Sequence, residues 1–353
     1  MSRRVLVNSF ALFALFALVM VSGLESPRSQ PRDVAVSGAS IPFAQRQAQS
    51  MATRVVVLLE EGDRVDENAG RVFEIFEDVD RTMSEWKDTS PLSQVNRQAG
   101  EGPVVLAPSL LAVLERSILI AEQTNGAFDP TWAALWGLWN FRSASPELPK
   151  DKEIQAAIAA VDWRKLRVDS SDGTAQLLQR GMKVGLGGIA KGYALDRSAE
   201  ELRSHGVANF VISTGGQVYA SGLREGHPWR VGIRDPRGSE EDFFTLLEVS
   251  NKSVSTSGDY ERFFMKDGVR YHHILDPRTG RPARGLRSAT VVSSDATLAD
   301  ALSTALMVLG PEEGLALATR WDGVEAVLVD ARGAVLVTPG LEQTLIRVHP
   351  PHP

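Results

Sequence analysis

A glycine-rich turn at residues 185–193, with the sequence Gly-Leu-Gly-Gly-Ile-Ala-Lys-Gly-Tyr, is the first candidate for chemistry. Its glycines, among them Gly185 and Gly188, let a ligand approach the main chain closely, and the helix predicted to follow offers free N–H groups that attract phosphate. Lys191 adds a positive charge at the same place. The turn is not a Walker A loop, because no Ser or Thr follows the lysine directly. Taken alone, it also fits an ordinary turn between a strand and a helix.

Asp300 and Thr304 are the second candidate. They lie four residues apart in a helix predicted over residues 297–309 and therefore share one face of it. A carboxylate and a hydroxyl at this spacing suit Mg²⁺ shared with a substrate phosphate. The structural alternative is that Asp300 is a solvated acid favourable to the helix dipole and that Thr304 serves packing.

The third candidate is His273, in the segment Tyr-His-His-Ile-Leu-Asp-Pro-Arg-Thr-Gly-Arg-Pro at residues 271–282. A histidine at the end of a strand, beside a turn, can act as a general base or contact a phosphate. The alternative is a turn in which Asp276 accepts hydrogen bonds from main-chain N–H groups while the histidines are half-buried. The remaining histidines lie near Gly or Pro, lack the spacing of metal ligands and are predicted to be surface residues: His205, His227, His349 and His352.

An aromatic region begins at Ala127, Phe128 and Asp129, which precede a tryptophan-rich segment. Aromatic rings with one carboxylate can hold a flat heterocycle by stacking on its face and hydrogen-bonding its edge. Trp86 presents the same possibility. The alternative for both is an ordinary hydrophobic core. The Ser-Thr-Gly-Gly turn at residues 213–216 is a further candidate for the wall of a pocket.

The elements that would position these residues mix helices and strands. Apolar residues at helical spacing predict helices over residues 65–84, 108–124, 152–160, 190–204 and 297–309. Strand-like runs are predicted at residues 53–59, 182–184, 209–214, 217–221, 229–233, 245–249, 253–257, 287–292, 326–329 and 335–338. Strands in the second half often follow one another directly, which favours an α+β fold with antiparallel sheet over a doubly wound parallel sheet.

Composition narrows the class of partner. The chain has 353 residues, 38 Lys plus Arg against 44 Asp plus Glu, and a formal charge of -6. Without a long basic run it lacks the footprint of a nucleic-acid-binding protein, so the expected ligand is small. The absence of cysteine excludes disulfides, thiolate zinc sites, iron–sulfur clusters and a cysteine nucleophile.

The N-terminal residues 1–24 read as an export signal. Two arginines precede an unbroken apolar run at residues 10–21, and small residues follow it. The length of this run leaves both a cleaved signal peptide and an uncleaved membrane anchor open. Residues 25–48 are rich in Ser, Pro, Gln and Arg and are predicted to be a flexible linker, so folding is expected to start near residue 49.

The order of these motifs closely resembles the ApbE family of flavin transferases. The matching segments are Met51–Thr53, Ser84–Asn96, Gly126–Pro130, Leu186–Asp196, Ser257–Tyr260, His273–Gly280 and Ala299–Ala305. The resemblance implies a single compact catalytic unit at residues 49–347 with a short tail at residues 348–353. It also implies an ApbE-like, T-fold-related α+β fold, with antiparallel sheets packed against helices.

The same resemblance implies an exported, Mg²⁺-dependent FAD:protein FMN transferase, acting in the periplasm or at the outer face of the cytoplasmic membrane. Such an enzyme cleaves the FAD pyrophosphate, attaches FMN to a Thr or Ser hydroxyl of an exported or membrane-bound redox protein, and releases AMP. The alternatives are an FAD pyrophosphatase that yields free FMN and AMP, and a flavin-binding protein without catalysis.

Residue by residue, the resemblance assigns contacts with FAD to Met51, Trp86, Ala127, Phe128, Asp129, Lys191 and His273, and ligands of Mg²⁺ to Asp300, Thr304 and the main-chain oxygen of Gly188. His273 and Asp300 would be the catalytic residues. Two positions depart from the family pattern. Gly185 replaces a usual Asp that contacts FAD, and Ala52 replaces a common Gly.

Overall fold

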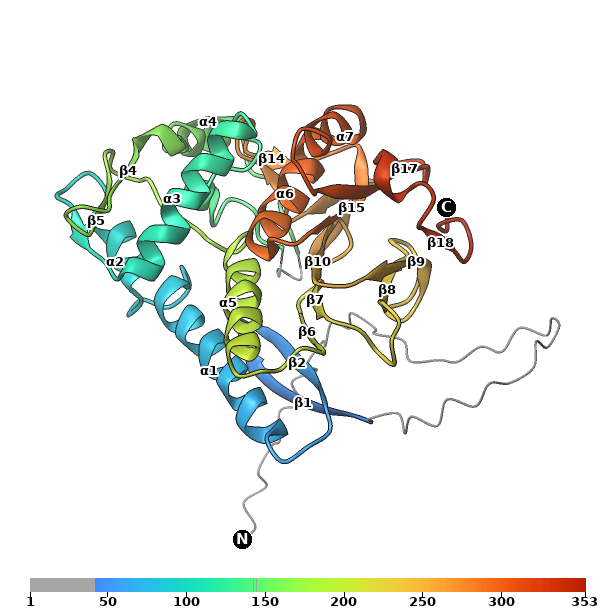
Figure 1. The fold of residues 1–353 in the computed structure, drawn as a ribbon. Coiled ribbons are helices and arrows are strands. Elements are labelled where there is room, and N and C mark those ends of the chain that lie inside the picture. The colour runs from blue at the N-terminus through green and yellow to red at the C-terminus, as the bar shows by residue number, and fades with distance from the viewer. Residues whose placement is uncertain (1–41, 142, 144) are drawn as a thin grey trace, which may run out of the picture.

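An eight-stranded antiparallel sheet lies at the centre of the fold (Figure 1). The structure is a computed structural model that describes residues 42–141, 143 and 145–353. In spatial order the strands are β1 (Phe43–Ser50), β2 (Thr53–Glu60), β6 (Phe210–Thr214), β7 (Gln217–Ser221), β10 (Lys252–Gly258), β15 (Leu286–Ser293), β16 (Glu325–Asp330) and β17 (Val335–Val337). The sheet therefore joins the N-terminal hairpin to the last strands of the domain.

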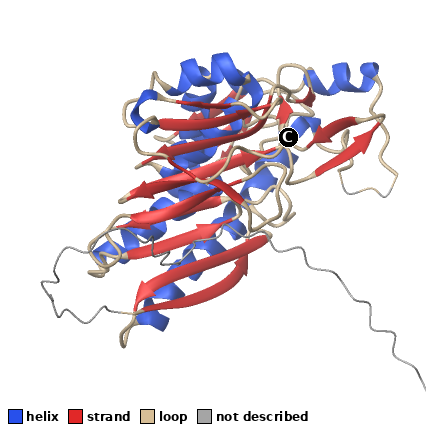
Figure 2. Ribbon diagram, turned by 90° about the vertical axis from the view of Figure 1, so that its right-hand side faces the viewer, coloured by secondary structure: helices blue, strands red, loops and turns tan. Residues whose placement is uncertain are grey.

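Helices cover one face of this sheet, as Figure 2 shows. Those that pack on its strands are α1 (Val65–Met83), α5 (Ala190–Ser204), α6 (Ala296–Leu309) and α7 (Pro311–Ala318), whereas α2 (Pro91–Arg97), α3 (Pro108–Gln123) and α4 (Asp151–Ile158) lie further out in Figure 1. Helix α6 is buried almost all round, because it packs on β10 and β15 and also against α5 and α7. Phe76 of α1 and Leu302 of α6 are fully buried in the resulting core.

A second, smaller sheet covers the opposite face. It consists of β18 (Ile346–Arg347), β9 (Phe243–Val249) and β8 (Trp229–Arg234). Trp229 and Phe244 of this sheet pack with Val218 and Val254 of the central sheet in a second core. Since apolar layers cover both faces, every residue of β15 is buried.

Shorter strands form the periphery. One three-stranded sheet contains β3 (Val104–Val105), β5 (Thr174–Leu177) and β4 (Leu166–Asp169), and two hairpins contain β11 (Phe263–Lys266) with β12 (Val269–His272) and β13 (Leu275–Asp276) with β14 (Arg281–Pro282). Short 3₁₀ segments lie at Ala133–Leu135, Trp163–Lys165 and Pro339–Leu341. Within the described ranges, no helix combines the length and the apolar character needed to span a bilayer.

The predicted α+β class is confirmed, and the five predicted helices lie within a few residues of α1, α3, α4, α5 and α6. Two predictions are wrong. Residues 43–48, assigned to the linker, belong to β1, an edge strand whose polar residues face solvent at little cost. Residues 182–184 form no strand: Lys183 makes a single isolated bridge to Trp132, although Met182 and Val184 are buried. The predicted leader and most of the linker lie outside the described residues.

Candidate active site

The crossing of α5 and α6 brings the glycine-rich turn to Asp300. Gly192 lies at the closest point, where a Cβ atom would overlap the main-chain carbonyl of Ala296. The missing side chain lets the main-chain N–H of Gly192 donate a 3.0 Å hydrogen bond to Asp300 Oδ2. At the start of α6, Asp196 accepts hydrogen bonds from the N–H groups of Ala296 and Thr297 and so holds α6 against α5.

Lys191 is the central residue of the candidate site. Its Nζ donates a 2.9 Å hydrogen bond to the main-chain oxygen of Gly187 and lies 3.9 Å from Asp300 Oδ1. Its aliphatic stem passes the turn between β6 and β7, where a Cβ at Gly215 would lie 3.4 Å from both Lys191 Cδ and Thr53 Oγ1. The 213–216 turn therefore does border the site. With a side chain that is 20% exposed, the lysine can meet an anion that enters from solvent.

Oxygen donors suitable for a hard cation gather next to this lysine. Thr304 Oγ1 lies at a long 3.5 Å from both Ser257 Oγ and the main-chain oxygen of Asp300. A Cβ at Gly188 would lie 3.2 Å from the same Thr304 oxygen, so the main chain of the glycine-rich turn runs past it. The Asp300 carboxylate, which is nearly fully buried, and the Thr304 hydroxyl are ligands that Mg²⁺ accepts. Thr304 thus lies close to both Asp300 and the main chain at Gly188, and the chemistry of the Asp300 carboxylate and the Thr304 hydroxyl fits the ion.

His273 lies within the electrostatic reach of Lys191. Burial is the main cause that lowers the pKa of its imidazole to about 3, and the positive charges of Arg262 and Lys191 act in the same direction. Its main-chain N–H is bound to the carbonyl of Arg262 at 2.9 Å. Among the described residues its Nδ1 is buried without a hydrogen-bond partner. A neutral imidazole with an unsatisfied nitrogen can form a hydrogen bond with a ligand group.

Two carboxylates near Lys191 were missed by the sequence analysis. Burial raises the pKa of Glu85, while the N–H groups of Leu186 and Gly187 and the charge of Lys191 favour its ionised form. Burial also raises the pKa of Glu261, against the charges of Arg234, Arg262 and Lys191. In the sequence, Glu85 is marked only by its neighbour Trp86, and Glu261 only by its neighbour Tyr260. An acidic residue in a loop is otherwise too common to predict a functional role.

Of the predicted contacts in the aromatic region, Trp86 is exposed and the others are buried. Trp86 is 60% exposed and packs edge-to-face with Trp136 at an interplanar angle of 78°. Ala127 and Phe128 are buried, and Phe128 Cε2 would lie 3.5 Å from a Cβ at Gly188. The exposed Trp86 is thus available to stack on a flat ligand, whereas Phe128 lies against the glycine-rich turn.

Asp129 is buried and its carboxylate is fully engaged within the protein. Its Oδ1 accepts hydrogen bonds from the N–H and the hydroxyl of Thr131, at 2.7 and 2.6 Å, and its Oδ2 accepts one from the N–H of Trp163 at 3.2 Å. Burial raises the pKa of this carboxyl. The structure therefore assigns Asp129 a part in holding the loop, and its contact with a ligand stays a prediction.

An open groove of about 640 Å³ lies elsewhere, between α1, α3 and α5. Its charged lining includes Arg71, Glu74, Asp78, Arg197 and Glu201. The candidate residues lie outside this lining. The candidate site is therefore defined by the groups around Lys191.

A comparison with known families identifies the family of this chain. The model of the ApbE family matches residues 51–328, a span that contains every candidate residue named above. The chain belongs to the ApbE family. An FAD:protein FMN transferase of Treponema pallidum is 40% identical over 273 residues, which cover 73% of this chain and 75% of that protein. One of Vibrio cholerae is 32% identical over 313 residues, 87% of this chain and 90% of that protein.

Solved ApbE structures have the same fold. The ApbE protein of Thermotoga maritima superimposes with a TM-score of 0.78 at 32% identity, covering 86% of this chain and 99% of that one. The flavin transferase ApbE of Vibrio cholerae gives a TM-score of 0.77 at 28% identity, covering 86% and 100%. The compact α+β unit is therefore the ApbE fold.

In this chain of the ApbE family, the side chain of Trp132 packs beside Gly185. Trp132 Nε1 donates a 3.0 Å hydrogen bond to the main-chain oxygen of Gly185. A Cβ at this glycine would lie 3.0 Å from Ala133 Cβ and 3.1 Å from the Trp132 ring. The space that a side chain at position 185 would need is occupied by the indole. A direct contact between residue 185 and FAD stays a prediction. Such a contact would involve main-chain atoms, because glycine has no side chain.

Met51 lies in the turn of the β1–β2 hairpin. Met51 and Ala52 both have positive φ angles, 50° and 57°, between the paired residues Ser50 and Thr53. The Met51 side chain packs against the main core. Thr53, two residues on, borders Lys191 through Gly215, so the hairpin turn lies at the margin of the site.

Proposed function

We propose that this chain is an FAD:protein FMN transferase. The observation that carries the proposal is the convergence of Lys191, the glycine-rich turn and the Asp300–Thr304 pair in a chain of the ApbE family. A positive charge, a glycine-rich main chain that a ligand can approach closely and hard oxygen ligands form a receptor for a pyrophosphate. The curated relatives are themselves FAD:protein FMN transferases.

The reaction is a phosphoryl transfer. A Thr or Ser hydroxyl of the acceptor protein attacks the phosphorus on the FMN side of the FAD pyrophosphate. A new P–O ester bond forms, the bridging P–O bond breaks, and AMP leaves. The hydroxyl proton passes to a base and ends on solvent or on the departing AMP. Positioning and charge neutralisation supply most of the catalysis in reactions of this kind.

Asp300, Thr304 and the main-chain oxygen of Gly188 would hold Mg²⁺, which neutralises charge on the phosphate oxygens when it is bound. Lys191 adds a fixed positive charge 3.9 Å from Asp300 Oδ1. His273 is neutral at physiological pH because its pKa is lowered to about 3. The negative charge of a bound pyrophosphate would raise that pKa, so the imidazole would become a better base only once substrate is in place.

The acceptor is proposed to be an exported or membrane-bound redox protein, and the site of action the periplasm or the outer face of the cytoplasmic membrane. The support is the export-signal pattern of residues 1–24.

The test mixes residues 42–353 with FAD, Mg²⁺ and an exported flavoprotein acceptor domain. An FMN-sized mass gain on the acceptor, with equimolar AMP, is the expected result. AMP with free FMN and an unlabelled acceptor would favour the pyrophosphatase. Intact FAD after long incubation would favour a binding protein without catalysis. An acceptor whose Thr or Ser is replaced by Ala is the matched control and is expected to remain unlabelled.

A further inference from the structure

A second cluster of polar side chains lies at the small sheet of β18, β9 and β8. It contains Asp235, which directly follows β8, and His349 and His352, which follow β18. One ligand atom from each residue lies within 4.8 Å of the other two. Asp235 Oδ2 is 2.8 Å from His352 Nδ1 and 3.9 Å from His349 Nδ1. The sequence analysis placed both histidines on the surface without ligand spacing, because Asp235 is 117 residues away from His352.

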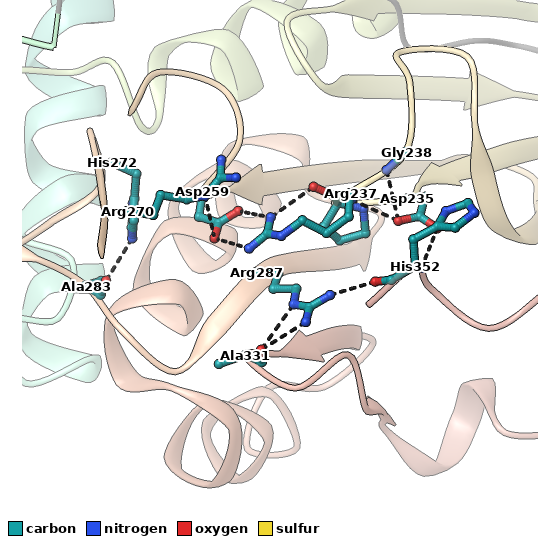
Figure 3. A network of polar contacts seen from close by, with 11 residues as sticks. Asp235, Arg237, Gly238, Asp259, Arg270, His272, Ala283, Arg287, Ala331 and His352 are labelled. Carbon is teal, nitrogen blue, oxygen red and sulfur yellow. Dashed lines mark hydrogen bonds and ion pairs between the residues drawn. The ribbon is translucent and has the colours of Figure 1, made fainter. Parts of the chain in front are cut away.

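The carboxylate of this cluster is oriented by its surroundings (Figure 3). Asp235 Oδ1 accepts hydrogen bonds from the N–H groups of Arg237, at 2.9 Å, and Gly238, at 3.2 Å. Its Oδ2 faces His352 and accepts a 2.9 Å hydrogen bond from the main-chain N–H of that residue. Arg287 Nη1 donates a 2.7 Å hydrogen bond to the main-chain oxygen of His352 and holds that residue in place. Such outer contacts are what orient the ligands of a metal ion.

The charge of the cluster also points to a cation. The Asp235 side chain is 0% exposed, while the side chains of His349 and His352 are 36% and 54% exposed. A buried carboxylate is costly unless a positive charge neutralises it. In the described part of the chain, Asp235 lies within ion-pair distance of these two imidazoles. A divalent ion would place a positive charge beside this carboxylate.

The distances fit a small tetrahedral ion. Ligand atoms at roughly 2.0–2.1 Å from zinc lie about 3.3 Å from one another. The observed 2.8 and 3.9 Å separations bracket that value, so side-chain adjustments of about half an ångström would suffice. Two imidazoles and one carboxylate are a donor set that favours zinc-class transition metals over Mg²⁺.

We propose that Asp235, His349 and His352 bind a divalent transition-metal ion of the zinc class. Nδ1 of each histidine and Oδ2 of Asp235 coordinate the ion, a water molecule fills the fourth position, and the N–H proton of the His352 ring moves from Nδ1 to Nε2. The ion fastens residues 346–352 to the small sheet. This segment already pairs with it through β18 and through the N–H of Val348, which donates to the carbonyl of Phe244 at 3.0 Å.

The test uses the purified chain without a histidine tag. Zn²⁺ is titrated calorimetrically, and thermal unfolding is followed with and without Zn²⁺. The expected result is one high-affinity site per chain and a rise in Tm. The double variant His349→Gln/His352→Gln should weaken Zn²⁺ binding at least about tenfold and abolish the Tm rise. The matched control His205→Gln/His227→Gln should bind Zn²⁺ like the wild type, and Mg²⁺ should not compete.

A second measurement keeps the proposal testable if the variants lose stability. Co²⁺ added to the wild-type chain should produce the intense visible absorption of a tetrahedral site, and Zn²⁺ should displace it. Either the absence of a stoichiometric site or equal binding by the His349→Gln/His352→Gln variant would overturn the proposal. Lower stability of that variant without any dependence on Zn²⁺ would identify the cluster as an ion-pair clasp, which also overturns it.

Discussion

Lys191 Nζ lies 3.9 Å from Asp300 Oδ1 across the crossing of α5 and α6. The two side chains come from helices about a hundred residues apart, and the glycine at position 192 permits the close approach. A lysine and a carboxylate at this distance keep both a positive charge and a hard oxygen ligand available for a phosphate and its cation. This pair is the centre of the proposed transferase site.

Replacing Asp300 with Asn should lower FMN transfer at least about a hundredfold, because the ionised oxygen that would hold Mg²⁺ is lost. The amide oxygen can still accept the hydrogen bond from Gly192, so the fold should survive. Initial rates across a Mg²⁺ series, with circular dichroism as the check on folding, measure the effect. Asp322→Asn, in an exposed turn, is the control. Wild-type rates at limiting Mg²⁺ in the Asp300 variant would refute the assignment.

Replacing His273 with Asn should slow transfer about 10²–10⁴-fold while changing FAD affinity much less, since a general base acts in the transition state. Equilibrium binding of FAD by fluorescence and single-turnover transfer separate the two effects. If affinity and rate fall by the same factor, His273 is a binding residue.

The free energy of unfolding should decrease as the pH falls from about 6.5 to 3, in part because of His273. Its pKa is about 3 in the folded chain and near 6.5 when unfolded, so the unfolded state takes up the proton first. Asp196, whose pKa burial raises to about 6, acts in the opposite direction: its contribution is lost as the pH rises through that value. Urea unfolding at several pH values should show a shallower loss for His273→Asn than for the wild type. Parallel curves would contradict the lowered pKa.

Introducing Asp at position 185, the residue that the resemblance leads us to expect there, should destabilise this chain by about 1–3 kcal/mol, because a side chain there meets Trp132 and Ala133. The double variant Gly185→Asp/Trp132→Ala should lose less stability than the sum of the two single variants. Chemical denaturation of all four proteins measures the coupling. Strict additivity would show that the indole does not occupy the space in question.

Ala52→Gly should stabilise the chain by up to about 1 kcal/mol, since Ala52 has a φ of 57° in the hairpin turn and glycine adopts this conformation without strain. Thermal unfolding of the variant measures the gain. Ala44→Gly, in the extended part of β1, is the control and should destabilise. A fall in Tm for Ala52→Gly would mean that the turn is not strained.

Short-range sequence patterns were sufficient to predict much of the secondary structure and part of the candidate site. Helical spacing located α1 and α6, and the four-residue separation of Asp300 and Thr304 placed both on one helix face. The glycine-rich turn before α5 was readable because glycine and helix-start signals act over a few residues. Strand β1 escaped prediction because an edge strand needs little apolar character, so its polar residues resemble a linker.

Tertiary structure decided the contacts between distant segments. The approach of Lys191 to Asp300 and the indole that fills the space at Gly185 depend on packing that no local pattern encodes. The same holds for the cluster of Asp235 with His349 and His352, which the small sheet brings together from distant parts of the chain. Residue type and short-range spacing determine which chemistry each side chain can perform. Its burial and its neighbours, which determine its charge and its accessibility to a ligand, are decided only when the helices and sheets pack together.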